Sequence, residues 1–177
     1  MRPLDFRTLF TLELAYVMRT LRRLGVQPAD LEDVAHEVFL VVHRSLDTYD
    51  PNRPVRPWLF SFAFRFASNY RRKLRPVADE SATAALSDDA PLADETLERA
   101  DERRLVMAAL ERIPIARRGV FVMHELDGVP IVEVARALDI PEGTAHSRLG
   151  KARQEFTEAL TKIAKKERHE PTTRTAS

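Results

Sequence analysis

The sequence predicts an all-α protein with two small helical domains that are joined by a flexible acidic linker. Only five glycines occur among 177 residues, and β-branched residues rarely alternate with polar ones, so β-strands are not indicated. Apolar residues recur instead at three- and four-residue intervals, as in amphipathic helices, and they do so in two separate blocks. The segment between the blocks consists mainly of Ala, Ser, Asp and Pro, and it has too few large apolar residues to build a core.

The first block covers residues 1–75 and predicts three helices. Gly25 is placed to end the first helix, because glycine is the usual residue just past a helix C-terminus. Asp30 is placed to cap the second helix, with Asp33 three positions later as in a capping box. Prolines precede the third helix, which carries most of the aromatic residues. The predicted helices span residues 5–24, 30–46 and 58–74.

The second block covers residues 99–164, and the linker, residues 76–98, separates it from the first. Because few contacts are expected across such a linker, the two domains are expected to move independently in the free chain. The tail, residues 165–177, has nothing to bury and is expected to be disordered. Helices are predicted over residues 92–112, 115–126, 130–138 and 141–163.

The formal net charge is only +1, but the charges are segregated along the chain. Every charged residue is basic over residues 53–75 and acidic over residues 79–98, and residues 148–168 are mostly basic. Each domain therefore offers one cationic segment. Such segments are typical of proteins that bind the phosphates of a nucleic acid.

Several other classes of protein are not indicated. No cysteine is present, which excludes disulfides and thiolate metal sites. His36, His43 and Glu32 share a helical side without a further ligand, and no phosphate-binding loop or nucleophile motif occurs, so no cofactor, metal or enzyme activity is predicted. A metal-dependent helical enzyme is the alternative, and it predicts stoichiometric bound metal. Residues 9–18 are apolar but too short to span a bilayer, so a cytoplasmic protein without membrane insertion is expected.

A helix-turn-helix is predicted around residues 138–141. Short polar side chains near the start of its second helix can reach base edges, and later cations on the same face can contact phosphates. The structural alternative is a helical hairpin with a solvated basic face. Apolar residues with the spacing that two short crossing helices require are Val132, Ala135, Leu138, Ile140, Ala145 and Leu149.

The run over residues 128–153 resembles region 4 of bacterial sigma factors. The resemblance extends upstream through residues 110–114 and 117–121, so it covers the whole second block. In sigma factors the second helix of this motif reads the −35 promoter element, and the resemblance implies the same role here. Carried over by position, the residues expected to bind −35 DNA are Thr144, His146, Ser147, Arg148, Lys151 and Arg153.

Residues 31–40, together with residues 57–60 and 69–72, resemble region 2 of the same family. With both regions present, the chain is similar to bacterial RNA polymerase sigma factors of the extracytoplasmic-function (ECF, group IV) subfamily. In that subfamily one helix of region 2 docks on core RNA polymerase. The residues at matching positions are Asp33, His36, Glu37, Leu40 and Arg44.

In sigma factors the loop after the docking helix and the helix that follows bind and melt the −10 promoter element. The loop, residues 49–56, can hold an extruded base, or it can be a proline turn that only spaces two helices, and the residues favour neither. Trp58, Phe62, Phe66 and Tyr70 lie four apart and favour a core stripe over base stacking. The residues expected to bind −10 DNA are Asn52, Arg53, Arg56, Arg65, Asn69 and Arg72.

The resemblance thus implies a sigma factor that binds core RNA polymerase through its β and β′ subunits and directs transcription initiation at specific promoters. Promoter DNA is the second implied partner, and an anti-sigma factor is a further one that the resemblance allows. The alternative is a helix-turn-helix regulator that binds DNA without the polymerase core. The acidic linker is either a segment that enters the nucleic-acid channel of the polymerase or a solvated tether.

Overall fold

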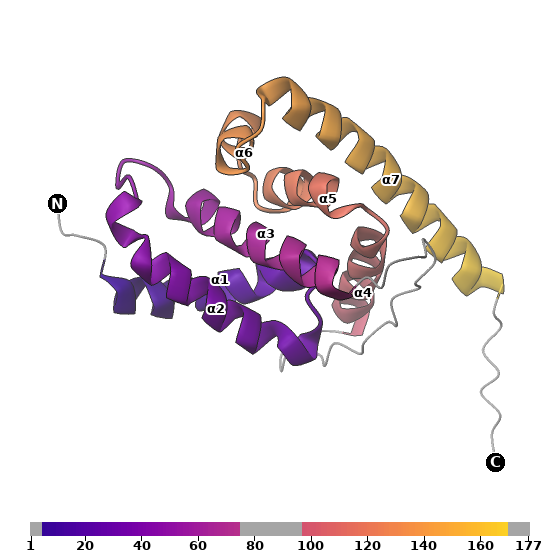
Figure 1. Cartoon of the computed structure of the whole chain (residues 1–177). Helices are drawn as coiled ribbons and strands as arrows, with labels where there is room; N and C mark the ends of the chain where they lie inside the picture. Colours follow the sequence, from indigo (N-terminus) through magenta and orange to yellow (C-terminus); the bar gives the residue numbers. More distant parts are fainter. Residues whose placement is uncertain (1–4, 75–96, 170–177) are drawn as a thin grey trace, which may run out of the picture.

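The computed structural model describes residues 5–74 and 97–169, and every regular element within these residues is helical (Figure 1). The predicted fold class is therefore confirmed. Of the predicted linker only residues 97 and 98 are described, and both belong to a helix. The rest of the linker and residues 170–177 of the predicted tail lie outside the described residues. Within the described ranges, no helix is both long and apolar enough to cross a membrane.

Three α-helices build the first half of the chain. Asp5 caps the first helix by accepting a hydrogen bond from the backbone N–H of Thr8 at 3.0 Å, and the chain leaves that helix through Gly25, whose φ of +96° suits glycine. The third helix begins at Val55, earlier than predicted, because Pro57 fits the first helical turn, where an N–H has no intrahelical partner. The helices are α1 (Phe6–Arg23), α2 (Leu31–Arg44) and α3 (Val55–Leu74).

Asp30 lies at the N-cap of α2 as predicted, but its carboxylate makes no capping hydrogen bond. It accepts a hydrogen bond from the hydroxyl of Tyr70 instead, and that hydroxyl also accepts one from the backbone N–H of Gln27 at 3.4 Å. The predicted capping box is therefore wrong. Tyr70 instead ties the end of α3 to the start of α2.

The second half contains four α-helices within its described residues. The helix α5 continues directly into a π-helical turn, Val122–Leu126. Asp139, in the turn before the last helix, has a φ of +52°, a left-handed conformation that aspartate tolerates better than most residues. The last helix continues to His169, past the predicted end at residue 163. The helices are α4 (Leu97–Glu111), α5 (Ile115–Phe121), α6 (Ile131–Ala137) and α7 (Glu142–His169).

The helix-turn-helix formed by α6 and α7 has a core that differs from the prediction at one residue. Val132 is 42% exposed, whereas Val134 is fully buried. The inward face of α6 carries Val134 and Ala135, and Val132 lies two residues before Val134, about 200° away around the helix axis, so it points outward. In α7, Ala145 and Leu149 are buried as predicted.

The two halves pack against each other. In Figure 1, α3 lies between α1 and α2 on one side and α5 and α6 on the other, and residues of α3 contact α6 directly. Leu59 and Phe60 of α3 belong to the same buried apolar cluster as Val120 and Met123 of the second half. The expectation of two independently moving domains is therefore wrong for this structure, because apolar side chains far apart in the sequence share one core.

Candidate functional site

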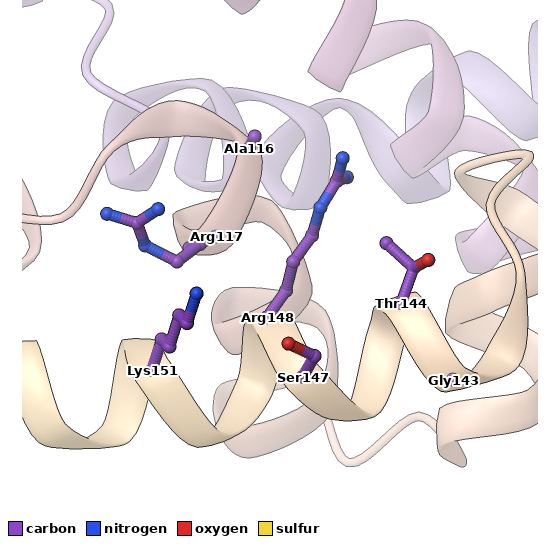
Figure 2. A pocket seen from close by; sticks show the side chains of 7 residues that line it. All are labelled: Ala116, Arg117, Gly143, Thr144, Ser147, Arg148 and Lys151. Carbon is purple, nitrogen blue, oxygen red and sulfur yellow. The ribbon is translucent and has the colours of Figure 1, made fainter.

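The outer face of α7 borders a shallow depression of about 440 Å³ between α7 and α5 (Figure 2). Figure 2 shows Arg148 and Lys151 extending from α7 toward α5, from which Arg117 also extends. Three cations beside short hydroxyl side chains form a surface suited to phosphates and base edges. The depression is lined by Ala116, Arg117, Gly143, Thr144, Ser147, Arg148 and Lys151.

Two of the residues expected to bind −35 DNA lie outside this depression. His146 is exposed and faces Glu142 at 3.7 Å on the same helix. Arg153 is paired with Glu125 of the π-helical turn, with its Nη2 2.6 Å and its Nε 2.7 Å from one carboxylate oxygen. The structure therefore brings together four of the six predicted residues and gives Arg153 an internal partner.

Arg117 is the lining cation that sequence reasoning missed. Its guanidinium makes two hydrogen bonds to the carboxylate of Glu155 in α7, at 2.9 and 2.5 Å, and these hydrogen bonds raise its pKa above the ordinary value. The two residues are 38 positions apart in the sequence. No helical periodicity relates residues so distant. The adjacent arginines at positions 117 and 118 gave no sign that one would be partly exposed and the other buried.

The outer face of α2 presents the five residues that were expected to bind core polymerase. Its inner face buries Val34, Val38 and Val42, so the opposite side of the same helix is left to solvent. Leu40 is an apolar side chain within this polar face and is 46% exposed. The exposed residues are Asp33, His36, Glu37, Leu40 and Arg44.

His36, His43 and Glu32 also lie on the exposed side of α2. Across the described part of the chain, no group of three or more His, Cys, Asp or Glu side chains is arranged to hold a metal ion. His43 instead packs edge to face against the ring of Phe6, with the ring centroids 4.6 Å apart.

The residues expected to bind −10 DNA fall into two sets. Arg65, Asn69 and Arg72 are exposed along α3, with Arg72 donating a hydrogen bond to the side chain of Asn69 at 3.1 Å. Asn52 lies in the preceding turn, where the carboxylate of Asp50 accepts hydrogen bonds from its backbone N–H and its amide group, at 2.9 and 3.1 Å. These four residues remain accessible.

Arg53 and Arg56 form the second set, and both are engaged within the protein. Arg53 pairs with Glu133 of α6 at 3.1 Å. Arg56 pairs with Glu13 of α1 at 2.9 Å and lies over the ring of Tyr16, 5.0 Å from its centroid. The loop between α2 and α3 is therefore in contact with the second half of the chain through Arg53.

The aromatic stripe of α3 is part of the core, as predicted. Phe62 is buried, and Trp58, Phe66 and Tyr70 are partly buried against the same cluster. Trp58 also contacts the ring of Tyr49, whose centroid is 4.9 Å away. These rings fix the loop to α3.

Comparison with known families agrees with the organisation of the chain. Residues 9–77 match Sigma-70 region 2, and residues 103–156 match Sigma-70, region 4. The ECF RNA polymerase sigma-E factor of Escherichia coli strain K12 is 30% identical over 139 residues, which cover 73% of this chain and 73% of that protein. The chain belongs to the extracytoplasmic-function sigma factors. The RNA polymerase sigma factor NccH of Alcaligenes xylosoxydans xylosoxydans is 28% identical over 145 residues, 78% of this chain and 77% of that protein.

Two solved structures share the fold of this sigma factor. The sigma factor RpoE of Bartonella quintana, in complex with the anti-sigma factor NepR, has a TM-score of 0.70 and 21% identity and covers 89% of this chain and 97% of that one. CnrH, in complex with the cytosolic domain of CnrY, has a TM-score of 0.63 and 23% identity and covers 88% of this chain and 87% of that one. This sigma factor directs promoter-specific transcription initiation, and its family is not an enzyme family.

Proposed function

We propose that this sigma factor works in the cytoplasm by binding core RNA polymerase through α2, the −10 element through residues 49–72 and the −35 element through α7. The observation that carries the proposal is the depression beside α7. There the cations Arg117, Arg148 and Lys151 adjoin the hydroxyl groups of Thr144 and Ser147. A surface of this composition suits DNA, because cations neutralise phosphates and short hydroxyl side chains reach base edges.

Within this surface the two residue types have different roles. Ser147 lies near the start of α7 and is exposed, so it is placed to contact a base edge in the major groove. Arg148 and Lys151 extend toward α5 and are placed to contact phosphates. Arg117 joins them from α5, so the phosphate-binding surface includes both helices.

The outer face of α2 is the proposed docking site for the β and β′ subunits. Protein interfaces commonly have an apolar centre bordered by a polar rim, and an exposed leucine surrounded by charged residues fits this arrangement. Leu40 is the proposed anchor, and Asp33, Glu37 and Arg44 supply charges on the same face. His36 provides a group that can donate or accept a hydrogen bond.

For the −10 element, Arg65, Asn69 and Arg72 form an exposed polar strip that is suited to the DNA backbone. The loop over residues 49–56 is proposed to receive an extruded base. Asn52, Arg53 and Arg56 provide the hydrogen-bond donors for it. A loop that only spaces α2 and α3 would leave these donors without a role in melting.

An anti-sigma factor is a proposed further partner. Both solved structures that share this fold contain a sigma factor bound to another protein, named in one case as an anti-sigma factor. The acidic linker is proposed to enter the polymerase, with the solvated tether as its alternative.

Transcription with purified components tests this proposal. The chain is mixed with core RNA polymerase of Escherichia coli and a pool of random-sequence DNA templates, and the RNA products are sequenced. A sigma factor is expected to co-purify with the core and to enrich transcripts that begin downstream of two shared sequence elements. Duplex binding without polymerase association or new start sites would instead favour a regulator that acts alone.

A further inference from the structure

Arg117 and Glu155 form an ion pair that joins α5 to α7 beside the depression. The Nε and Nη2 atoms of Arg117 donate to separate oxygens of the Glu155 carboxylate, at 2.9 and 2.5 Å. A guanidinium held by two such hydrogen bonds is fixed in direction as well as in place. The Arg117 side chain is 30% exposed and that of Glu155 is 29% exposed, so a large ligand can still reach the pair.

The pair uses only one edge of the guanidinium. An arginine side chain has five N–H donors in a planar fork, and the hydrogen bonds to Glu155 come from Nε and Nη2 of Arg117. The two N–H groups of Nη1 and the second one of Nη2 take no part in them. A phosphate is the kind of acceptor that binds two such N–H groups side by side. The geometry therefore suits a carboxylate on one edge of Arg117 and a phosphate on the other.

An apolar contact holds α5 against α7 next to this pair. Phe156, the residue after Glu155, packs against Phe121 of α5, with the ring centroids 4.8 Å apart. Phe121 lies about one helical turn after Arg117. The two helices are therefore held together at this point without help from the ion pair, and the Glu155 carboxylate has a fixed place from which to orient Arg117.

The depression also brings like charges together. Arg117, Arg148 and Lys151 line it, and Figure 2 shows Lys151 reaching from α7 toward the helix that carries Arg117. Like charges at close range repel, which favours side-chain positions that point away from the depression. Glu155 opposes this repulsion by holding Arg117 where it is.

We propose that Glu155 is a positioning residue for −35 DNA: it holds one edge of Arg117 so that Nη1 and Nη2 meet a phosphate on the α5 side of the depression. This inference rests on the proposed binding of −35 DNA by α7. The negative charge of Glu155 by itself repels DNA, so its two effects on affinity have opposite signs. Salt screens the repulsion, whereas it does not replace the lost orientation of a long, flexible side chain.

DNA binding at several salt concentrations tests this role. The full chain is titrated into a fluorescent duplex pool of random sequence, which reports phosphate contacts irrespective of sequence, and anisotropy is measured. Glu155→Gln is expected to steepen the salt dependence by up to about one counterion, because Arg117 loses its neutralising partner. At the highest salt at which the wild type still binds, the same variant is expected to bind about three- to tenfold more weakly, because Arg117 is no longer oriented. Equal or tighter binding by Glu155→Gln at every salt concentration overturns the proposal.

Two further variants show whether Glu155 acts through Arg117. In an Arg117→Ala background, Glu155→Gln is expected to raise the affinity, because no guanidinium is left to orient and one repulsive charge is gone. Glu125→Gln is the matched control, since it removes the carboxylate that pairs with Arg153 of the same helix outside the depression. It is expected to cause no loss of affinity at high salt.

Circular dichroism checks that the variants keep their helices. If Glu155→Gln unfolds, Glu155→Asp takes its place, because it keeps the charge and shortens the side chain by one methylene group. Its expected result is a lower affinity at an unchanged salt dependence. Wild-type affinity for Glu155→Asp in that case overturns the proposal.

A pair of lysine variants separates this inference from the proposed function. Lys151 lines the depression, whereas Lys162 is exposed on α7 outside it. If Lys151→Ala weakens binding no more than Lys162→Ala does, DNA does not lie on this surface, and the proposed function of α7 fails together with the inference. If Lys151→Ala has the larger effect while Glu155→Gln binds like Glu125→Gln, the DNA-binding surface stands and the positioning role alone is overturned.

Discussion

The carboxylate of Asp127 accepts a hydrogen bond from Tyr16 at 3.0 Å and one from Arg23 at 2.9 Å, although 111 and 104 positions separate these residues in the sequence. Burial raises the pKa of Asp127 even though Tyr16 and Arg23 favour its ionised form. The desolvation of the carboxylate thus outweighs its two partners. This relationship makes the free energy of unfolding of the chain depend measurably on pH.

The folded chain is expected to become more stable toward unfolding as the solution is acidified through the raised pKa of Asp127. The folded chain retains the Asp127 proton at pH values above the ordinary pKa of 3.8, where the unfolded chain has lost it. The free energy of unfolding therefore falls as pH rises through that window. Urea unfolding of wild type and Asp127→Asn between about pH 4 and pH 7 measures the effect, since the asparagine removes this one titration. A wild-type stability that instead rises with pH relative to Asp127→Asn contradicts the prediction.

The loss of stability caused by replacing the buried Arg118 is expected to depend more on the volume of the new side chain than on its charge. With a pKa of about 10 caused mainly by burial, the charged side chain costs on the order of 3 kcal/mol at neutral pH, and its hydrogen bond to the carbonyl of Ile113 at 3.1 Å offsets part of this. Arg118→Met is expected to leave the free energy of unfolding within about 1 kcal/mol of wild type. Arg118→Ala leaves a cavity and is expected to lose about 2–4 kcal/mol. Urea denaturation distinguishes the pair, and equal losses for both variants would contradict the argument.

Substitutions beside α7 are expected to separate phosphate binding from base reading. Arg148→Ala and Lys151→Ala should each weaken holoenzyme binding to all promoters and reduce the salt dependence by about one counterion. Ser147→Ala should instead relax sequence preference at one position, by roughly 1–3 kcal/mol. Binding isotherms of the holoenzyme at several salt concentrations provide both quantities.

Arg153→Ala is the control for these variants, because Arg153 is engaged with Glu125 outside the depression. A smaller change in salt dependence is expected for it than for Lys151→Ala. An effect of Arg153→Ala equal to or larger than that of Lys151→Ala would show that the DNA follows a different path over α7.

A charge placed on the apolar position of α2 is expected to prevent polymerase docking without unfolding the chain. Leu40 is 46% exposed, so Leu40→Asp removes little buried surface but places an uncompensated charge in the proposed interface. Its dissociation constant for core polymerase is expected to rise by about tenfold or more. Leu12→Asp, at a leucine of α1 that is 69% exposed, is the matched control and should bind normally. Equal binding by both variants would place the interface elsewhere.

The sequence predicted the helices well because their apolar spacing is a local property. On α2 it separated the buried face, with Val34 and Val38, from the exposed face, with Glu37 and Leu40. It missed the core role of Val134, because the short helix α6 carries valines on two sides, at positions 132 and 134, and packing against the rest of the chain decides which side is buried.

Contacts between distant segments could not be predicted in the same way. Arg117 reaches the α7 surface because the turn after α4 aligns two helices, and its partner Glu155 lies 38 positions away. Arg53 was expected to be available to DNA and instead contacts Glu133, 80 positions away. Periodicity relates residues along one helix, whereas these pairs depend on how separate helices pack.

The π-helical turn at Val122–Leu126 decides where Asp127 points. Such a turn adds one residue to the helical path, which rotates everything after it by about 100° around the helix axis. A chain shortened by one residue there would retain both helical units but turn the Asp127 carboxylate away from Tyr16 and Arg23. The contacts of Asp127 with α1 thus depend on a single additional residue in the helix that precedes it.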